Sequence, residues 1–89
     1  MLIDDARKAK RIRTKDFDDE LNILINACKK DLTRRGVLEQ KIIDDDPLIK
    51  TAVICYVKAY FGDNSNVDIW VGLYDDMANA LALDSQYNE

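Results

Sequence analysis

The residues from Asp46 to Gly62, DPLIKTAVICYVKAYFG, constrain the fold more than any other stretch of the chain. Asp46 can cap a helix, and Pro47 then occupies the first helical position, which needs no backbone N–H. Only three side chains between positions 48 and 61 are clearly polar: Lys50, Thr51 and Lys58. A helix that is apolar nearly all round is surrounded by other elements. We therefore expect the central helix of the fold here, closed by Gly62.

A second long helix is predicted by DFDDELNILINACKKDLTRRG, residues 16–36. Asp16 or Asp18 can cap its start, and acidic residues fill its first turn, where the helix dipole favours them. Basic residues fill the last turns, and Gly36 supplies a left-handed stop. Apolar residues recur at intervals of three and four and predict one buried stripe: Leu21, Leu24, Ile25, Cys28 and Leu32.

Two further helices complete the pattern. A short one is expected over about residues 2–11, with an apolar side made of Ile3, Ala6, Ala9 and Ile12. After a turn at DNSNV, with Ser65 or Asn66 as a cap, a last helix is expected over about residues 67–83. Its expected buried stripe consists of Trp70, Leu73, Tyr74, Met77, Ala80, Leu81 and Leu83.

The predicted fold class is therefore all-α, a small bundle of about four helices in a single domain over residues 1–89. It has a short N-terminal helix, two long helices and a C-terminal helix, and no strand pattern competes seriously with this interpretation. Residues 37–46 are expected to form an ordered connector through the apolar pairs Val37–Leu38 and Ile42–Ile43. The polar ends of the chain, about residues 1–5 and 85–89, are candidates for disorder.

Charge is distributed unevenly along the 89 residues. The net charge is −4, but residues 1–41 hold 11 basic and 8 acidic residues, a balance of +3, and residues 42–89 hold 2 basic and 9 acidic residues, a balance of −7. Such polarity suits head-to-tail packing of like subunits, or a surface with a DNA-tolerant and a DNA-repelling side. A core this small often completes its burial against a partner or against copies of itself.

Nothing in the sequence indicates catalysis or a bound cofactor. The chain has no histidine, its three glycines are isolated, and Cys28 and Cys55 lie in apolar stretches typical of reduced core cysteines. The carboxylates of Asp44–Asp46 favour a solvated turn over a metal site, since sequence neighbours rarely converge on one ion. The aromatic residues favour core packing over base stacking. No apolar run is long enough to span a bilayer. We expect no enzyme activity, cofactor, metal, small-molecule substrate or membrane association. We expect the protein to be located or assembled in a reducing cytoplasm.

The segment ARKAKRIRTK, residues 6–15, carries the strongest local charge. Its candidate contact residues are Arg7, Lys8, Lys10, Arg11, Arg13 and Lys15. A free basic arm would bind DNA phosphates, since each neutralised phosphate releases counterions. However, the same segment places apolar residues at helical spacing after acidic residues, as a solvated amphipathic helix does. The charge pattern alone favours the helix face and leaves the arm open.

Taken together, these segments resemble a known family. The order RIRTKDFDDEL, LNILINACKKDLTRRGV, DPLIKTAVICYVKAYFGDNSN and LALDSQYN is similar to that of the small head–tail connector proteins of long-tailed double-stranded DNA bacteriophages and prophages. These proteins are also called head-completion, adaptor or DNA-packaging proteins. The resemblance runs from about Ala6 to Tyr87, and its most specific part is residues 46–62.

The resemblance implies an all-α subunit that assembles into a ring beneath the portal of the filled head. The ring would extend the DNA channel, help retain the packaged genome and dock the tail. The implied partners are other copies of the chain, the portal protein, a tail-side completion or tail-terminator protein, and double-stranded DNA that passes without sequence recognition. The implied location is the virion's head–tail junction, reached after assembly in the host cytoplasm. Caps and core positions are expected at Phe17, Asp18, Leu21, Asp46, Pro47, Tyr56, Tyr60, Gly62, Trp70 and Tyr74.

On this interpretation the basic segment contacts a neighbouring subunit, the portal or the DNA channel. The alternative is a small helical DNA-binding phage regulator, suggested by RRGVLEQK, where Gly36 follows a helix as in a helix-turn-helix motif. The acidic cluster at residues 44–46 argues against a recognition helix there, because phosphates would repel it. A generic protein-interaction bundle is a third candidate.

Overall fold

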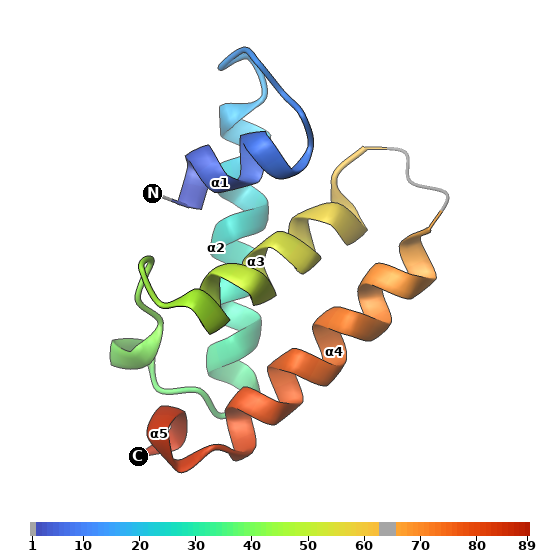
Figure 1. Cartoon of the computed structure of the whole chain (residues 1–89). Helices are drawn as coiled ribbons and strands as arrows, with labels where there is room; N and C mark the ends of the chain where they lie inside the picture. Colours follow the sequence, from blue (N-terminus) through green and yellow to red (C-terminus); the bar gives the residue numbers. More distant parts are fainter. Residues whose placement is uncertain (1, 63–65) are drawn as a thin grey trace.

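Helices form at the four places where the apolar pattern predicts them (Figure 1). The computed structural model describes residues 2–62 and 66–89, so part of the predicted DNSNV turn, including the Ser65 cap, lies outside the described residues. The elements are α1 (Leu2–Ala9), α2 (Asp18–Arg35), the 3-10 helix η1 (Glu39–Lys41), α3 (Pro47–Tyr60), α4 (Val67–Leu83) and α5 (Ser85–Asn88). No strand occurs among these described residues, which confirms the all-α prediction.

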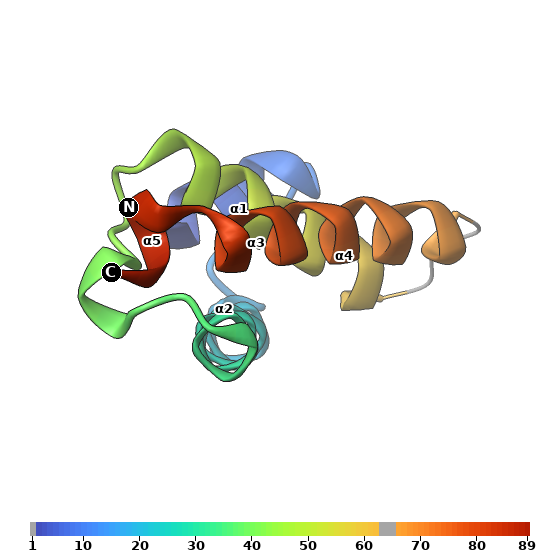
Figure 2. The same ribbon diagram turned by 90° about the horizontal axis from the view of Figure 1, so that it is seen from below.

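The central helix is α3, as its composition predicts. It packs side by side with α4, contacts α2 and α1 on its other sides, and thereby links the whole bundle (Figure 1). Asp46 caps its start, where a carboxylate oxygen accepts hydrogen bonds from the backbone N–H groups of Leu48 at 2.9 Å and Ile49 at 3.4 Å. Pro47 occupies the first position. Figure 2 shows α2 nearly end-on while α4 lies across the view, so these two helices cross steeply.

The core is one cluster of buried side chains drawn from every helix except η1. Its largest fully buried members are Tyr74, Leu21, Leu32, Ile49, Val37, Val53, Val57 and Cys28. Gly36 ends α2 with φ of +123°, and the N–H of Val37 donates to the carbonyl of Leu32 at 3.0 Å. This left-handed stop turns the chain so that Val37 enters the core, as the sequence predicts.

Two predicted helix ends are wrong. The residue that precedes α2 is Phe17, without a capping side chain, because the Asp18 carboxylate instead binds Arg7. Helix α1 is shorter than expected and ends at Ala9, after which Arg11 adopts φ of +57°.

Helices lie close to both ends of the described chain. Leu2 is buried in α1, and Tyr87 of α5 is buried against the start of α3. The Tyr87 hydroxyl donates to the Asp46 carboxylate at 2.9 Å, and the backbone carbonyl of Tyr87 accepts from the N–H of Leu38 at 2.8 Å. Side chains far apart in the sequence thus hold residues 85–88 in place, which a local pattern cannot reveal.

The predicted buried stripe of α4 is partly wrong. Tyr74 and Leu81 are buried, as expected, and Ala78 joins them. Leu73, Ala80 and Leu83 are exposed instead. Because α4 is apolar on two sides, periodicity identifies the helix but not the side that faces α3.

Candidate assembly surface

The basic segment of residues 6–15 is divided by the structure into one inward-facing residue and an exposed turn. Arg7 donates to both carboxylate oxygens of Asp18 at 2.7 Å and also binds Asp4. The hydrogen-bonded Arg7 guanidinium holds the pKa of the Asp18 carboxyl below its usual range. Arg7 therefore ties the end of α1 to the start of α2.

The remaining cations form what we call the basic turn, residues 10–15 between α1 and α2, with Lys8 just before it. Lys8, Arg11, Arg13 and Lys15 are exposed, and Lys10 is half-buried. Figure 1 shows this turn looping out at one end of the bundle. The 10–15 segment contains four basic residues and no acidic one, although Asp16 and Asp19 follow shortly after.

An apolar surface adjoins the basic turn. The Lys10 ammonium lies 6.0 Å from the Phe61 ring centre, and the Phe17 ring packs edge-on against Phe61 at 5.7 Å. Next to these rings lies an open hollow of about 210 Å³, lined by Glu20, Ile23, Leu24, Tyr60, Phe61 and Gly62. Phe17, Ile23 and Tyr60 are 45%, 66% and 50% exposed. Two of the residues expected as core or caps, Phe17 and Tyr60, are thus about half exposed.

A second apolar surface runs along α4, on the side away from α3. We call it the outer stripe: Ile69, Leu73, Asp76, Ala80 and Leu83. These residues recur at intervals of three and four and are all exposed, with Ile69 at 60% and Leu83 at 84%. Among the described residues, no element covers this side of α4 (Figures 1 and 2). Four of the five are apolar, with Asp76 between Leu73 and Ala80, and exposed apolar residues grouped in this way mark an interaction surface more often than isolated ones do.

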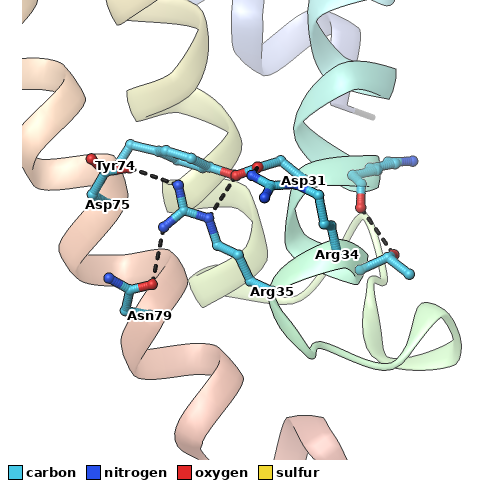
Figure 3. A network of polar contacts seen from close by, with 8 residues as sticks. Asp31, Arg34, Arg35, Tyr74, Asp75 and Asn79 are labelled. Carbon is cyan, nitrogen blue, oxygen red and sulfur yellow. Dashed lines mark hydrogen bonds and ion pairs between the residues drawn. The ribbon is translucent and has the colours of Figure 1, made fainter.

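A polar network fixes α4 against α2 and so sets the direction of the outer stripe (Figure 3). The Arg35 guanidinium donates to Asp31 at 2.8 Å, to Asp75 at 2.7 Å and to Asn79 at 3.0 Å. The Tyr74 hydroxyl donates to the same Asp31 oxygen at 2.7 Å, and the Arg35 guanidinium lies 5.3 Å from the Tyr74 ring centre. One arginine thus joins three side chains of α4 to the end of α2.

Electrostatics favour the charged form of this network. Burial opposes ionisation of Asp31, but hydrogen bonds from Tyr74, Arg34 and Arg35 outweigh it, so its pKa lies below the ordinary value. Burial and the bond to Asp31 raise the pKa of Tyr74, which stays protonated and remains a donor. Sequence reasoning missed the network because its partners on α2 and α4 lie some 40 positions apart. The local signals were the pairs of Asp31 with Arg34 at i, i+3 and with Arg35 at i, i+4.

Both cysteine thiols are buried and poorly suited to act as nucleophiles. Burial raises the pKa of the Cys28 thiol to about 12, and burial likewise raises the pKa of Cys55, so both stay protonated near neutral pH. Within residues 2–62 and 66–89, no cluster of carboxylates and thiols could hold a metal ion. An open hollow of about 490 Å³ is lined by Lys29, Lys30, Thr33, Glu39 and Ile42, and Lys29 there binds Asp44 at 3.0 Å.

The helix-turn-helix interpretation of residues 34–41 is not supported by the backbone. After Gly36 the chain forms only the three-residue η1, and the next α-helix begins at Pro47. A recognition helix needs several turns to enter the major groove. The segment after α2 therefore lacks the element that would read DNA.

Comparison with known proteins decides the family. The family described as "Phage connector protein" has a sequence model that matches residues 2–88. The chain belongs to this family. Searches of curated proteins and of solved structures found no significant match to this chain.

Membership in the phage connector family gives the chain a structural head–tail connector role and implies assembly with other head or tail proteins of the phage. The family is a structural one and not a class of enzymes. It also points to the head–tail junction of the virion as the location. In the part of the connector that the structure describes, no helix is both long and apolar enough to cross a membrane.

Proposed function

We propose that this phage connector chain is the repeating subunit of a ring that sits beneath the portal of the DNA-filled head. In that position the ring extends the DNA channel, helps to retain the genome and presents the surface on which a tail-side protein docks. The observation that carries the proposal is the family match over residues 2–88. It is supported by two exposed apolar surfaces on a chain of only 89 residues.

The charge of the molecule agrees with a conduit that does not grip DNA. With a net charge of −4, the subunit as a whole repels the phosphate backbone, and residues 42–89 carry a balance of −7. A bore lined by the acidic half would avoid the tight phosphate contacts that arrest a moving duplex. The basic turn is then available for protein contacts.

The functional test is disruption of the gene in cells that produce the phage. We expect DNA-filled heads and complete tails to accumulate separately, and a plasmid copy of the wild-type gene to restore joined particles. The matched control is a plasmid copy with a stop codon early in α2. Normal yields of infectious, tailed particles without the protein would refute the proposal.

A further inference from the structure

The outer stripe of α4 needs an occupant, and its chemistry narrows the choice. Ile69, Leu73 and Leu83 present apolar side chains, and Asp76 lies among them. Residues 67–89 contain five acidic residues and no basic one. The surface that covers this stripe should therefore be apolar at its centre and positively charged at its edge.

Symmetric pairing of two α4 helices does not meet this requirement. Helix α4 runs from Val67 to Leu83, so a two-fold axis through its middle would place the two Asp76 side chains next to each other. Like charges brought together in an interface oppose association. No lysine or arginine on α4 can compensate them.

The chain itself carries a surface of the required kind. The hollow beside Phe17, Ile23 and Tyr60 is open and mostly apolar, with Glu20 as its one acidic lining residue. Lys10, the first cation of the basic turn, lies 6.0 Å from the Phe61 ring centre at its edge. The basic turn also includes Arg11, whose left-handed backbone is unfavourable for an L residue. Strained backbone that persists away from the core is a frequent mark of functional sites.

We propose that the outer stripe of α4 in one copy docks onto the hollow and basic turn of the next copy. The proposal rests on the proposed ring function and specifies its subunit contact. The two surfaces lie on different elements, α4 and the α1–α2 end, so the contact is head-to-tail, and a head-to-tail contact whose rotation closes generates a ring. Apolar side chains meet apolar side chains, and Asp68, Asp76 and Asp84 meet the cations of the basic turn.

The first test is a concentration series of the full chain followed by amide chemical shifts in NMR. We expect the amides of the outer stripe and those of residues 10–17 to shift together below about 1 mM. Shifts confined to α4 would indicate symmetric pairing and overturn the proposal. Absence of any concentration-dependent shift up to that limit would also overturn it.

The second test is complementary charge reversal. Asp76→Lys alone, and Arg11→Glu with Arg13→Glu alone, should each weaken self-association about tenfold or more. An equimolar mixture of the two variants should recover it, because the basic α4 of one now faces the acidic turn of the other. Such recovery also shows that both variants are folded. Failure of the mixture to recover association would contradict the proposal.

Matched controls come from exposed charges outside both surfaces. Lys30→Glu on α2 and Asp45→Lys in the segment between α2 and α3 change the charge by the same amount per residue. Both should leave self-association unchanged. The outcomes also separate this contact from the ring function. If a plasmid copy of the Asp76→Lys variant restores joined heads and tails as the wild-type gene does, the proposed α4 contact is wrong while the ring function stands.

Discussion

Arg11 shows how a single residue can be held in an unfavourable state by its position. It adopts φ of +57° and ends α1, while the N–H of Ile12 donates back to the carbonyl of Arg7 at 2.8 Å. Glycine is the usual residue at such a stop because it lacks a Cβ. The chain retains a charged residue there instead.

Arg11→Gly should therefore raise the free energy of unfolding by up to about 1 kcal/mol, because relief of left-handed strain exceeds the entropy that glycine adds to the unfolded chain. Urea denaturation followed by circular dichroism measures this change. Arg13→Gly, at an exposed position without positive φ, should lower stability slightly. If Arg11→Gly destabilises the protein as much as Arg13→Gly does, the strain is absent.

Asp31 gives the second prediction at this scale. Its pKa is lowered on folding, so the folded protein binds the proton less readily than the unfolded chain, whose aspartate has a pKa of about 3.9. The resulting stabilisation is present above that value and is lost as the pH falls through the folded-state pKa. Asp31→Asn should lower the free energy of unfolding by about 1–3 kcal/mol at pH 7, because it removes the charge that Tyr74, Arg34 and Arg35 bind.

Thermal or urea unfolding between pH 7 and pH 2.5 measures the effect. The difference between wild type and Asp31→Asn should narrow once the pH falls below about 4. Asp45→Asn, at an exposed position between α2 and α3, should leave the free energy of unfolding within about 0.5 kcal/mol of the wild-type value. A difference that is constant across the pH range would mean that the carboxylate charge does not stabilise the network.

At the scale of the element, α4 has two apolar sides with different roles. Tyr74, Ala78 and Leu81 face the core, while the outer stripe faces solvent. Burial of the first side stabilises the isolated fold, and the second side contributes only when something covers it. Stability and assembly should therefore be separable on one helix.

Leu81→Ala should lower the free energy of unfolding by about 2–5 kcal/mol, as deletion of buried leucine atoms does. Leu83→Ala, with a side chain 84% exposed, should change it by less than about 0.5 kcal/mol. Urea denaturation of both variants at low protein concentration provides the comparison. A large stability loss from Leu83→Ala would show that the outer side of α4 is part of the monomer's core.

The helices themselves were predictable because their signals are local. Asp46–Pro47 and Gly36 mark a start and a stop by the geometry of adjacent residues, and the α2 stripe follows helical spacing. The orientation of α4 was not predictable, because both of its sides are apolar and only packing against α3 distinguishes them. The pairs Arg7–Asp18 and Tyr87–Asp46 were missed for a related reason, because chain folding brings together residues that the sequence separates.

The candidate site was predictable only in part. The basic segment stands out in the sequence, but which of its cations point outward depends on where α1 ends. Arg7 lies before that end and binds Asp18, whereas Arg13 lies in the exposed turn. The hollow beside Tyr60 could not be foreseen, since it forms between α2 and α3.

At the scale of the whole molecule, the separation of charge predicts weak and unspecific contact with DNA. The net charge of −4 opposes binding, and the basic turn offers only four cations. In fluorescence anisotropy with a labelled duplex, we expect binding that is equal for unrelated sequences and is lost on raising salt or adding competitor DNA. Sequence-selective binding that survives competitor would favour the regulator over the connector ring.

The most direct test of the connector account is reconstitution with the portal from the same genome. Purified protein is mixed with purified portal rings, and the product is imaged by electron microscopy. We predict a second ring stacked on one end of the portal, coaxial with its channel, and the same stack with the control Lys30→Glu. Portal rings that remain bare at every ratio of the two proteins would contradict the account.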